Sequence, residues 1–168
     1  SSSSVPSFSE LWSVAYDEMS WVIELRRELH RLPELMYNES VTSDKIGRVL
    51  SSLGVEYTRG WSVNTKHAEL AAKGFESGDG STGIVAEIGT GRPPCVLLRA
   101  DIDALPIMER SPLPFSSEYA GRMHACVLDG HAAMLVGAAA VLKKREAELN
   151  GTVRLIWQPA EEGGAVGK

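Results

Sequence analysis

The chain has 168 residues, of which 43% are hydrophobic and 23% are charged, so its composition is that of a globular protein with one core. Its 17 Lys and Arg against 22 Asp and Glu leave a formal net charge of -5, which argues against nucleic acid or an anionic membrane as a partner. No apolar run approaches the roughly 20 residues that a membrane-spanning helix needs. The expected partner is therefore a small molecule or another protein.

Residues 1–20 are predicted to form a Ser-rich N-terminal tail that is partly disordered, and residues 21–168 to form the structured part of the chain. Apolar residues at three- and four-residue spacing predict a helix from Trp21 to Arg31. The same spacing predicts a second helix over about residues 40–53. Residues 60–81 contain several glycines and scattered charges, and they are predicted to be a loop or insertion.

The second half of the chain alternates strand and helix patterns. Short β-branched or apolar runs predict strands at residues 83–88, 95–100 and 152–157, and helical periodicity predicts a long helix over about residues 130–149. A strand, a long helix and another strand indicate a right-handed crossover and a mainly parallel sheet, in the α/β class. Polar residues that follow these strands should then lie at the carboxyl edge of the sheet, where open α/β folds bind ligands.

Two acidic groups follow predicted strands. Asp101 and Asp103 come directly after one strand, and their spacing of two places them on one side of an extended segment. They can ligate a metal or orient a ligand, or they can simply accept backbone hydrogen bonds in the loop. Glu161 and Glu162 follow the next strand, where one carboxylate could bind a metal while the other acts as a general base. Adjacent acids are also common in solvated surface turns.

A third group combines metal-binding side chains over a short stretch. His124, Cys126, Asp129 and His131 lie within eight residues of a chain that contains only four His and two Cys. Thiolate and imidazole suit zinc and other first-row metals. A buried Cys and a His that caps a helix are the structural alternatives. A thiol redox protein is disfavoured, because the sequence has no Cys-x-x-Cys pair.

Together these segments resemble the peptidase M20 family, and within it the aminoacylase-like branch that includes hippurate hydrolases and hydrolases of indole-3-acetyl (IAA)-amino acid conjugates. The resemblance is carried by residues 26–35, 98–107, 121–126, 129–135 and 151–164. It implies a three-layer α/β fold with a mainly parallel sheet flanked by helices. It also implies that residues 21–168 form the N-terminal portion of the catalytic domain, without the dimerisation or lid domain and the C-terminal part.

The resemblance also implies roles for particular residues. Cys126 and Glu162 would be metal ligands, Glu161 the general acid and base, and Asp103 the carboxylate that orients the site. The metal would be a divalent ion, manganese or zinc, and the substrate a small N-acyl amino acid. The compartment is left open: the protein is expected to be soluble, and cytoplasmic or in the lumen of the endoplasmic reticulum if plant-like. The full-length family form would be able to form a homodimer.

One position departs from the family pattern. The family reads Cys-Gly-His-Asp where this chain reads Cys126-Val127-Leu128-Asp129, so Leu128 stands at the position of a ligand His. A leucine side chain has no lone pair to donate, and loss of even an outer partner lowers metal affinity or activity by roughly 10- to 100-fold. The expectation is a truncated, weakly active or inactive hydrolase. The alternative is a non-catalytic paralogue or fragment that binds another protein.

Overall fold

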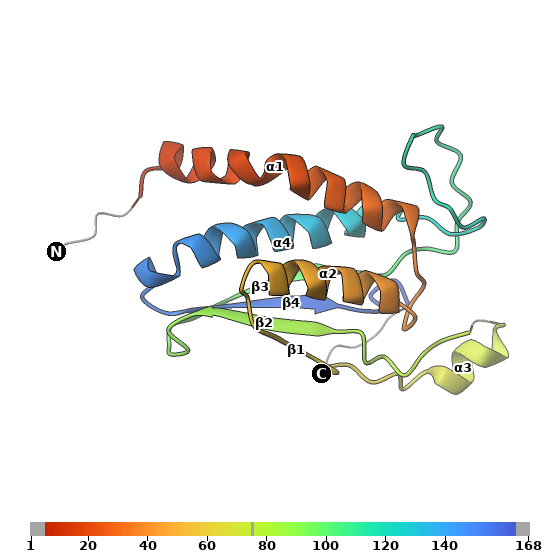
Figure 1. The fold of residues 1–168 in the computed structure, drawn as a ribbon. Coiled ribbons are helices and arrows are strands. Elements are labelled where there is room, and N and C mark those ends of the chain that lie inside the picture. The colour runs from red at the N-terminus through yellow and green to blue at the C-terminus, as the bar shows by residue number, and fades with distance from the viewer. Residues whose placement is uncertain (1–5, 75, 164–168) are drawn as a thin grey trace.

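The computed structural model describes residues 6–74 and 76–163. Its helices are α1 (Phe8–Arg31), α2 (Ser40–Ser52), α3 (His67–Ala72), α4 (Leu128–Lys144) and the short 3-10 helix η1 (Glu146–Glu148). Its strands are β1 (Tyr57–Arg59), β2 (Ile84–Gly89), β3 (Cys95–Asp101) and β4 (Thr152–Gln158). Helices α1, α2 and α4 lie together on one face of the sheet (Figure 1).

The four strands form one sheet in the order β1-β2-β4-β3. The α/β class is confirmed, but only the β3 and β4 pair is parallel, while β1 with β2 and β2 with β4 are antiparallel. The described sheet is therefore mixed rather than mainly parallel. The reason is that only the unit from β3 through α4 to β4 has the helical crossover that returns a strand in the same direction.

Helix α1 begins earlier than the sequence pattern predicts. The side chain of Ser7 accepts the N–H of Glu10, and the Glu10 carboxylate accepts the N–H of Ser7 at 2.7 Å, which together form a capping box. This cap starts the helix at Phe8. The predicted tail over residues 1–20 is thus corrected for residues 8–20, which are helical; residues 1–5 lie outside the described residues.

The main core lies between the helices and the sheet. It joins Leu25 and Leu29 of α1 and Leu50 of α2 to the inward-facing side chains of α4 and the strands. Trp157 on β4 is fully buried, and its indole N–H donates to the carbonyl of Ala132 at 3.2 Å. Because β4 is flanked by β2 and β3, its carboxyl end is held firmly at the edge where the candidate site lies.

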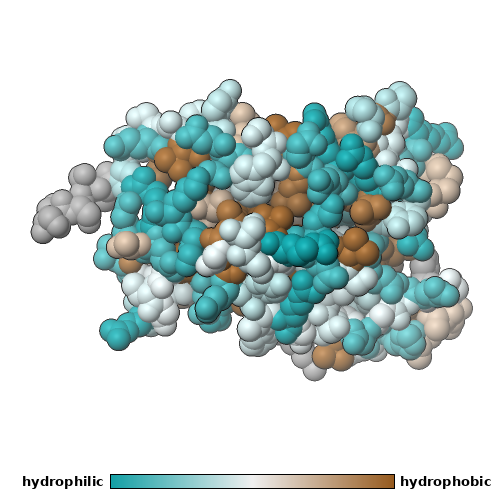
Figure 2. All heavy atoms as spheres, viewed as in Figure 1, coloured by the Kyte–Doolittle hydropathy of each residue, from teal (hydrophilic) through white to brown (hydrophobic). Residues whose placement is uncertain are grey.

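The region predicted to be a loop over residues 60–81 contains the short helix α3. In the described part of the chain, no helix is both long and apolar enough to cross a membrane. The face seen in Figure 2 is largely hydrophilic, with hydrophobic patches interrupted by hydrophilic side chains.

Candidate active site

The parallel pair β3 and β4 brings together the segments that were predicted to carry chemistry. In the register of this pair, Asp101 lies opposite Gln158, so the two strands end side by side. The chain after β3 leads directly to Asp103, and the chain after β4 turns through residues 160–162. The predicted placement at a shared carboxyl edge is therefore observed.

Asp103 holds the turn that follows β4. Its two carboxylate oxygens accept the backbone N–H groups of Glu161 at 3.0 Å and Glu162 at 2.9 Å. The side chain is buried, and this burial raises its pKa to about 6, although the two N–H groups favour the charged form. Asp103 therefore fixes the backbone that presents the two glutamates.

Cys126 and Glu162 lie next to each other, as predicted. The pKa of the Cys126 thiol is raised first by its hydrogen bond with the Glu162 side chain and then by the charge of that carboxylate. Cys126 is exposed, whereas atom Oε1 of Glu162 is buried and has no hydrogen-bond partner in the described part of the chain. Glu161 is exposed. A thiol and a carboxylate thus converge beside an accessible second carboxylate.

Asp101 does not join Asp103 in this arrangement. Its carboxylate forms two hydrogen bonds with the guanidinium of Arg99, at 2.9 and 2.8 Å. Asp101 is the last residue of β3, and it is Asp103, two residues further on, that accepts hydrogen bonds from the turn after β4.

The segment that follows Cys126 has an unusual backbone. Val127 adopts the left-handed conformation, with φ 65° and ψ 20°, immediately before α4. A β-branched residue is disfavoured there, because its Cβ atom crowds the backbone. Leu128 begins α4 and is buried, so it contributes an apolar side chain where the family pattern has a ligand His.

Glu39 is a site residue that sequence reasoning missed. Its carboxylate is fully buried and accepts hydrogen bonds from the N–H of Tyr37, the N–H of Ala160 and the hydroxyl of Thr82. Burial is the main cause that raises its pKa to about 7. No local pattern around Glu39 could have signalled this role, because Thr82 and Ala160 are distant in the sequence.

A second buried group of charges supports the start of α4. His30 contacts Asp129 at 2.8 Å and Glu109 at 3.1 Å, and Arg26 pairs with the same Asp129 at 2.8 Å. The ring of His124 lies 6.4 Å from that of His30, centroid to centroid, and burial lowers its pKa to about 4. Asp129 therefore belongs to a buried network with α1, whereas the ring nitrogens of His124 are buried without a hydrogen-bond partner in the described part of the chain.

The described residues do not form a complete metal site. Cys126 and Glu162 supply two donors, and the unpartnered Oε1 of Glu162 is an acceptor that a cation could use. No group of three or more His, Cys, Asp and Glu side chains is arranged to hold a metal ion in the described ranges. Structural zinc sites have four protein ligands and catalytic ones three, so this donor set does not fit a tightly held metal.

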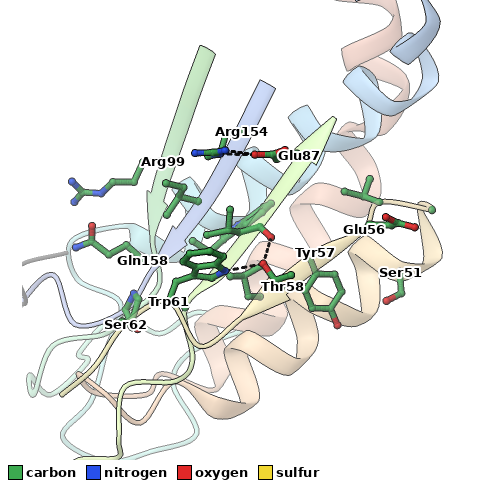
Figure 3. Close-up of a pocket in the computed structure, with 18 residues that line it drawn as sticks. Ser51, Glu56, Tyr57, Thr58, Trp61, Ser62, Glu87, Arg99, Arg154 and Gln158 are labelled. Atoms are coloured by element: carbon green, nitrogen blue, oxygen red, sulfur yellow. Dashed lines mark hydrogen bonds and ion pairs between the residues drawn. The ribbon is translucent and has the colours of Figure 1, made fainter. Parts of the chain in front are cut away.

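A separate cavity lies over the sheet face that α1, α2 and α4 leave uncovered (Figure 3). Its volume is about 1190 Å³, and among the residues that line it are Trp61, Arg99, Arg154 and Gln158. Within it, Arg154 pairs with Glu87 and the indole of Trp61 donates to Thr58. In the described part of the chain, its lining includes none of the four predicted site residues.

Comparisons with known proteins agree with the resemblance seen in the sequence. Residues 97–168 match the model of peptidase family M20/M25/M40. The chain is 42% identical over 152 residues to the IAA-amino acid hydrolase ILR1-like 5 of Arabidopsis thaliana, covering 90% of this chain and 31% of that protein. It is 43% identical over 142 residues to an N-acetylcysteine deacetylase of Bacillus subtilis, covering 84% of this chain and 33% of that protein.

Solved structures show the same relationship. The Bacillus subtilis YXEP protein, a dinuclear metal binding peptidase from the M20 family, matches with a TM-score of 0.72 and 42% identity, over 88% of this chain and 37% of that one. An aminohydrolase from methicillin-resistant Staphylococcus aureus matches with a TM-score of 0.73 and 32% identity, over 90% of this chain and 34% of that one. The chain spans about a third of the length of the curated relatives that it matches. On this evidence the chain is similar to members of the peptidase M20 family over most of its own length.

Proposed function

We propose that this chain is part of an amidohydrolase that cleaves the amide bond of N-acyl amino acids, with indole-3-acetyl-amino acid conjugates as one candidate class. The names of two relatives, an IAA-amino acid hydrolase and an N-acetylcysteine deacetylase, both describe an acyl group joined to an amino acid. The observation that carries the proposal is the convergence of Cys126 and Glu162 beside the turn that Asp103 holds.

In this proposal Glu161 is the general acid and base. It is exposed on a turn whose backbone is fixed, so its carboxylate can take a proton from an attacking water molecule. The same carboxyl group then gives that proton to the leaving amine, and the products are a carboxylic acid and a free amino acid. Asp103 acts through the backbone of Glu161 and Glu162 and does not touch the reacting atoms.

Cys126 and Glu162 are the proposed metal ligands, for manganese or zinc. Because Leu128 adds no donor and the described residues supply only these two, we expect weak metal binding. The same deficit leads us to expect little or no turnover by this chain. A full complement of ligands would be needed for the metal to polarise an amide carbonyl, as metal ions do in hydrolases.

Metal content and hydrolysis, measured on the same preparation, test the proposal. We expect substoichiometric metal after purification and near-zero release of amino acid from N-acetyl and indole-acetyl amino acids. Robust turnover that a chelator abolishes would contradict the expected defect. The double variant Val127→Gly/Leu128→His should bind manganese or zinc roughly 10- to 100-fold more tightly, because it adds an imidazole donor. Val127→Gly alone is the matched control, since it changes the backbone without adding a ligand.

A second candidate function is protein binding without catalysis. Strand β3 lies at the edge of the sheet, and its side chains Val96, Leu97 and Leu98 are exposed. An exposed apolar edge strand offers unpaired N–H and C=O groups to a strand from another chain. Sedimentation analysis over a range of concentrations tests this: the chain should associate, and Leu97→Lys should weaken the association. A monomer at every concentration, together with no captured partner strand, would contradict this candidate.

A further inference from the structure

We infer that Glu39 is a positioning residue for the turn that carries Glu161 and Glu162. The inference rests on the proposed function, because that function gives the two glutamates their chemical task. Glu39 immediately precedes α2, more than a hundred positions from the turn in the sequence, and its side chain is 0% exposed. It reaches the turn through the interior of the fold.

Three hydrogen bonds define what Glu39 joins. Its Oε1 accepts the N–H of Ala160 at 2.9 Å and the N–H of Tyr37 at 2.8 Å, while Oε2 accepts the hydroxyl of Thr82 at 2.8 Å. These donors belong to the loop before α2, the approach to β2 and the turn after β4. A buried carboxylate that satisfies three donors has little freedom to move, so it fixes Ala160 relative to the other two segments.

The backbone of Ala160 needs such support. Its φ is 57°, a left-handed conformation that is unfavourable for a residue with a Cβ atom. Conformations of this kind persist only where the surrounding structure holds them. Here Glu39 holds the N–H of Ala160, and Asp103 holds the next two N–H groups, those of Glu161 and Glu162. Without Glu39, Ala160 is free to relax to an ordinary φ, which would redirect both glutamates.

Capping of α2 does not account for the side chain of Glu39. The first turn of α2 is capped by Glu34, whose carboxylate accepts the N–H of Val41 at 3.1 Å and the N–H of Thr42 at 2.7 Å. Glu39 itself makes no side-chain capping hydrogen bond to the helix. Its carboxylate is therefore available to the turn.

The test uses the 168-residue chain without metal or substrate and compares three variants. Glu39→Ala removes the acceptor, and Glu39→Gln keeps an oxygen for the two N–H groups while its amide can donate to the Thr82 hydroxyl. Leu50→Ala is the matched control, since it opens a cavity in the core face of α2 and leaves the turn intact. Two readouts follow the turn: hydrogen exchange of the amides of residues 160–162, and the alkylation rate of Cys126 by iodoacetamide.

Glu39→Ala should speed exchange at Ala160, Glu161 and Glu162 by more than its loss of global stability explains. It should also speed alkylation of Cys126 roughly threefold or more, because the Glu162 carboxylate that disfavours the thiolate moves away. Cys95, which is exposed at the other end of β3, should react at an unchanged rate and serves as the internal control. Glu39→Gln should behave like the unaltered chain in both readouts.

Equal effects of Glu39→Ala and Leu50→Ala on both readouts would overturn the inference, because Glu39 would then act on stability alone. If Glu39→Ala does not fold, Glu39→Asp replaces it: the shorter side chain should release the Ala160 amide, and unchanged exchange there would equally overturn the inference. Neither readout depends on turnover. An absence of metal binding and hydrolysis by the double variant Val127→Gly/Leu128→His would therefore count against the proposed function and leave this result intact.

Discussion

The turn at residues 160–162 and the segment at residues 126–128 meet at the candidate active site, but their backbones are supported differently. In the turn, three consecutive N–H groups are accepted by the buried carboxylates of Glu39 and Asp103. In the segment, Val127 has a left-handed backbone that suits glycine, and Leu128 brings no donor. The turn that presents Glu161 and Glu162 is therefore fully supported by side-chain acceptors, whereas the segment combines a left-handed backbone with an apolar side chain at position 128.

The largest effect is expected for a variant that removes hydrogen bonds from the turn at residues 160–162. Asp103→Ala leaves two N–H groups without their acceptor in a buried environment, which should lower the free energy of unfolding by about 2–4 kcal/mol. Asp103→Asn is the matched control, because its amide oxygen retains one acceptor and should cost less. Urea denaturation measures both. An equal loss in the two variants would mean that packing, and not the hydrogen bonds to the turn, accounts for the effect.

The next effect is a pH dependence that arises from Glu39. Its pKa is about 7 in the folded protein against 4.5 as the ordinary value, so between these pH values the folded state holds a proton that the unfolded state has released. The contribution of Glu39 to the free energy of unfolding is fully present below pH 4.5 and is lost as the pH rises through 7. The loss should be about 1–3 kcal/mol between pH 5 and pH 8, measured by urea denaturation.

Glu39→Gln should remove most of this dependence, because the amide does not titrate. Asp103, whose pKa is also raised, contributes a remaining slope of the same sign, and His124, whose pKa is lowered to about 4, contributes a slope of the opposite sign below pH 6.5. If the variant and the unaltered chain show the same slope, Glu39 is not the group that titrates.

The smallest expected effect concerns the left-handed backbone of Val127. Val127→Gly should raise the free energy of unfolding by about 0.5–1 kcal/mol, because relief of the left-handed strain exceeds the entropy that glycine loses on folding. Val127 is exposed, so little packing is lost. Thermal unfolding measures the change, and Val127→Ala, which keeps a Cβ atom, should stabilise much less. A destabilised glycine variant would show that the Val127 side chain makes a contribution larger than its strain.

Much of this arrangement was predictable from the sequence. Helix α2, the strands β2, β3 and β4, and the crossover through α4 follow from hydrophobic periodicity and from turn residues at their ends. The crossover makes β3 and β4 parallel, and this alone brings the segment of Asp103 to that of Glu161 and Glu162. The catalytic and metal-binding roles of these residues stay predictions.

The remainder depended on contacts that no local pattern encodes. An acidic residue just before a helix is common, so the position of Glu39 before α2 did not single it out. Its partners Thr82 and Ala160 are known only from the fold. The left-handed backbone of Val127 was equally hidden, because valine is a residue that sequence reasoning would not assign to that conformation. The mixed sheet was missed because the residues of β2 predict a strand but do not show that it pairs with β4 in the antiparallel direction.

The position of β4 between β2 and β3 has a consequence for how the protein is made. Although β2 and β3 are translated first, they do not pair with each other; until β4 emerges, β2 has only the three-residue β1 beside it and β3 has no neighbour in the described sheet. During translation, β2 and β3 therefore cannot pair with β4 until residue 158 has left the ribosomal exit tunnel. Nascent chains stalled before that point should remain open to proteases, whereas chains released after it should become resistant together with the site.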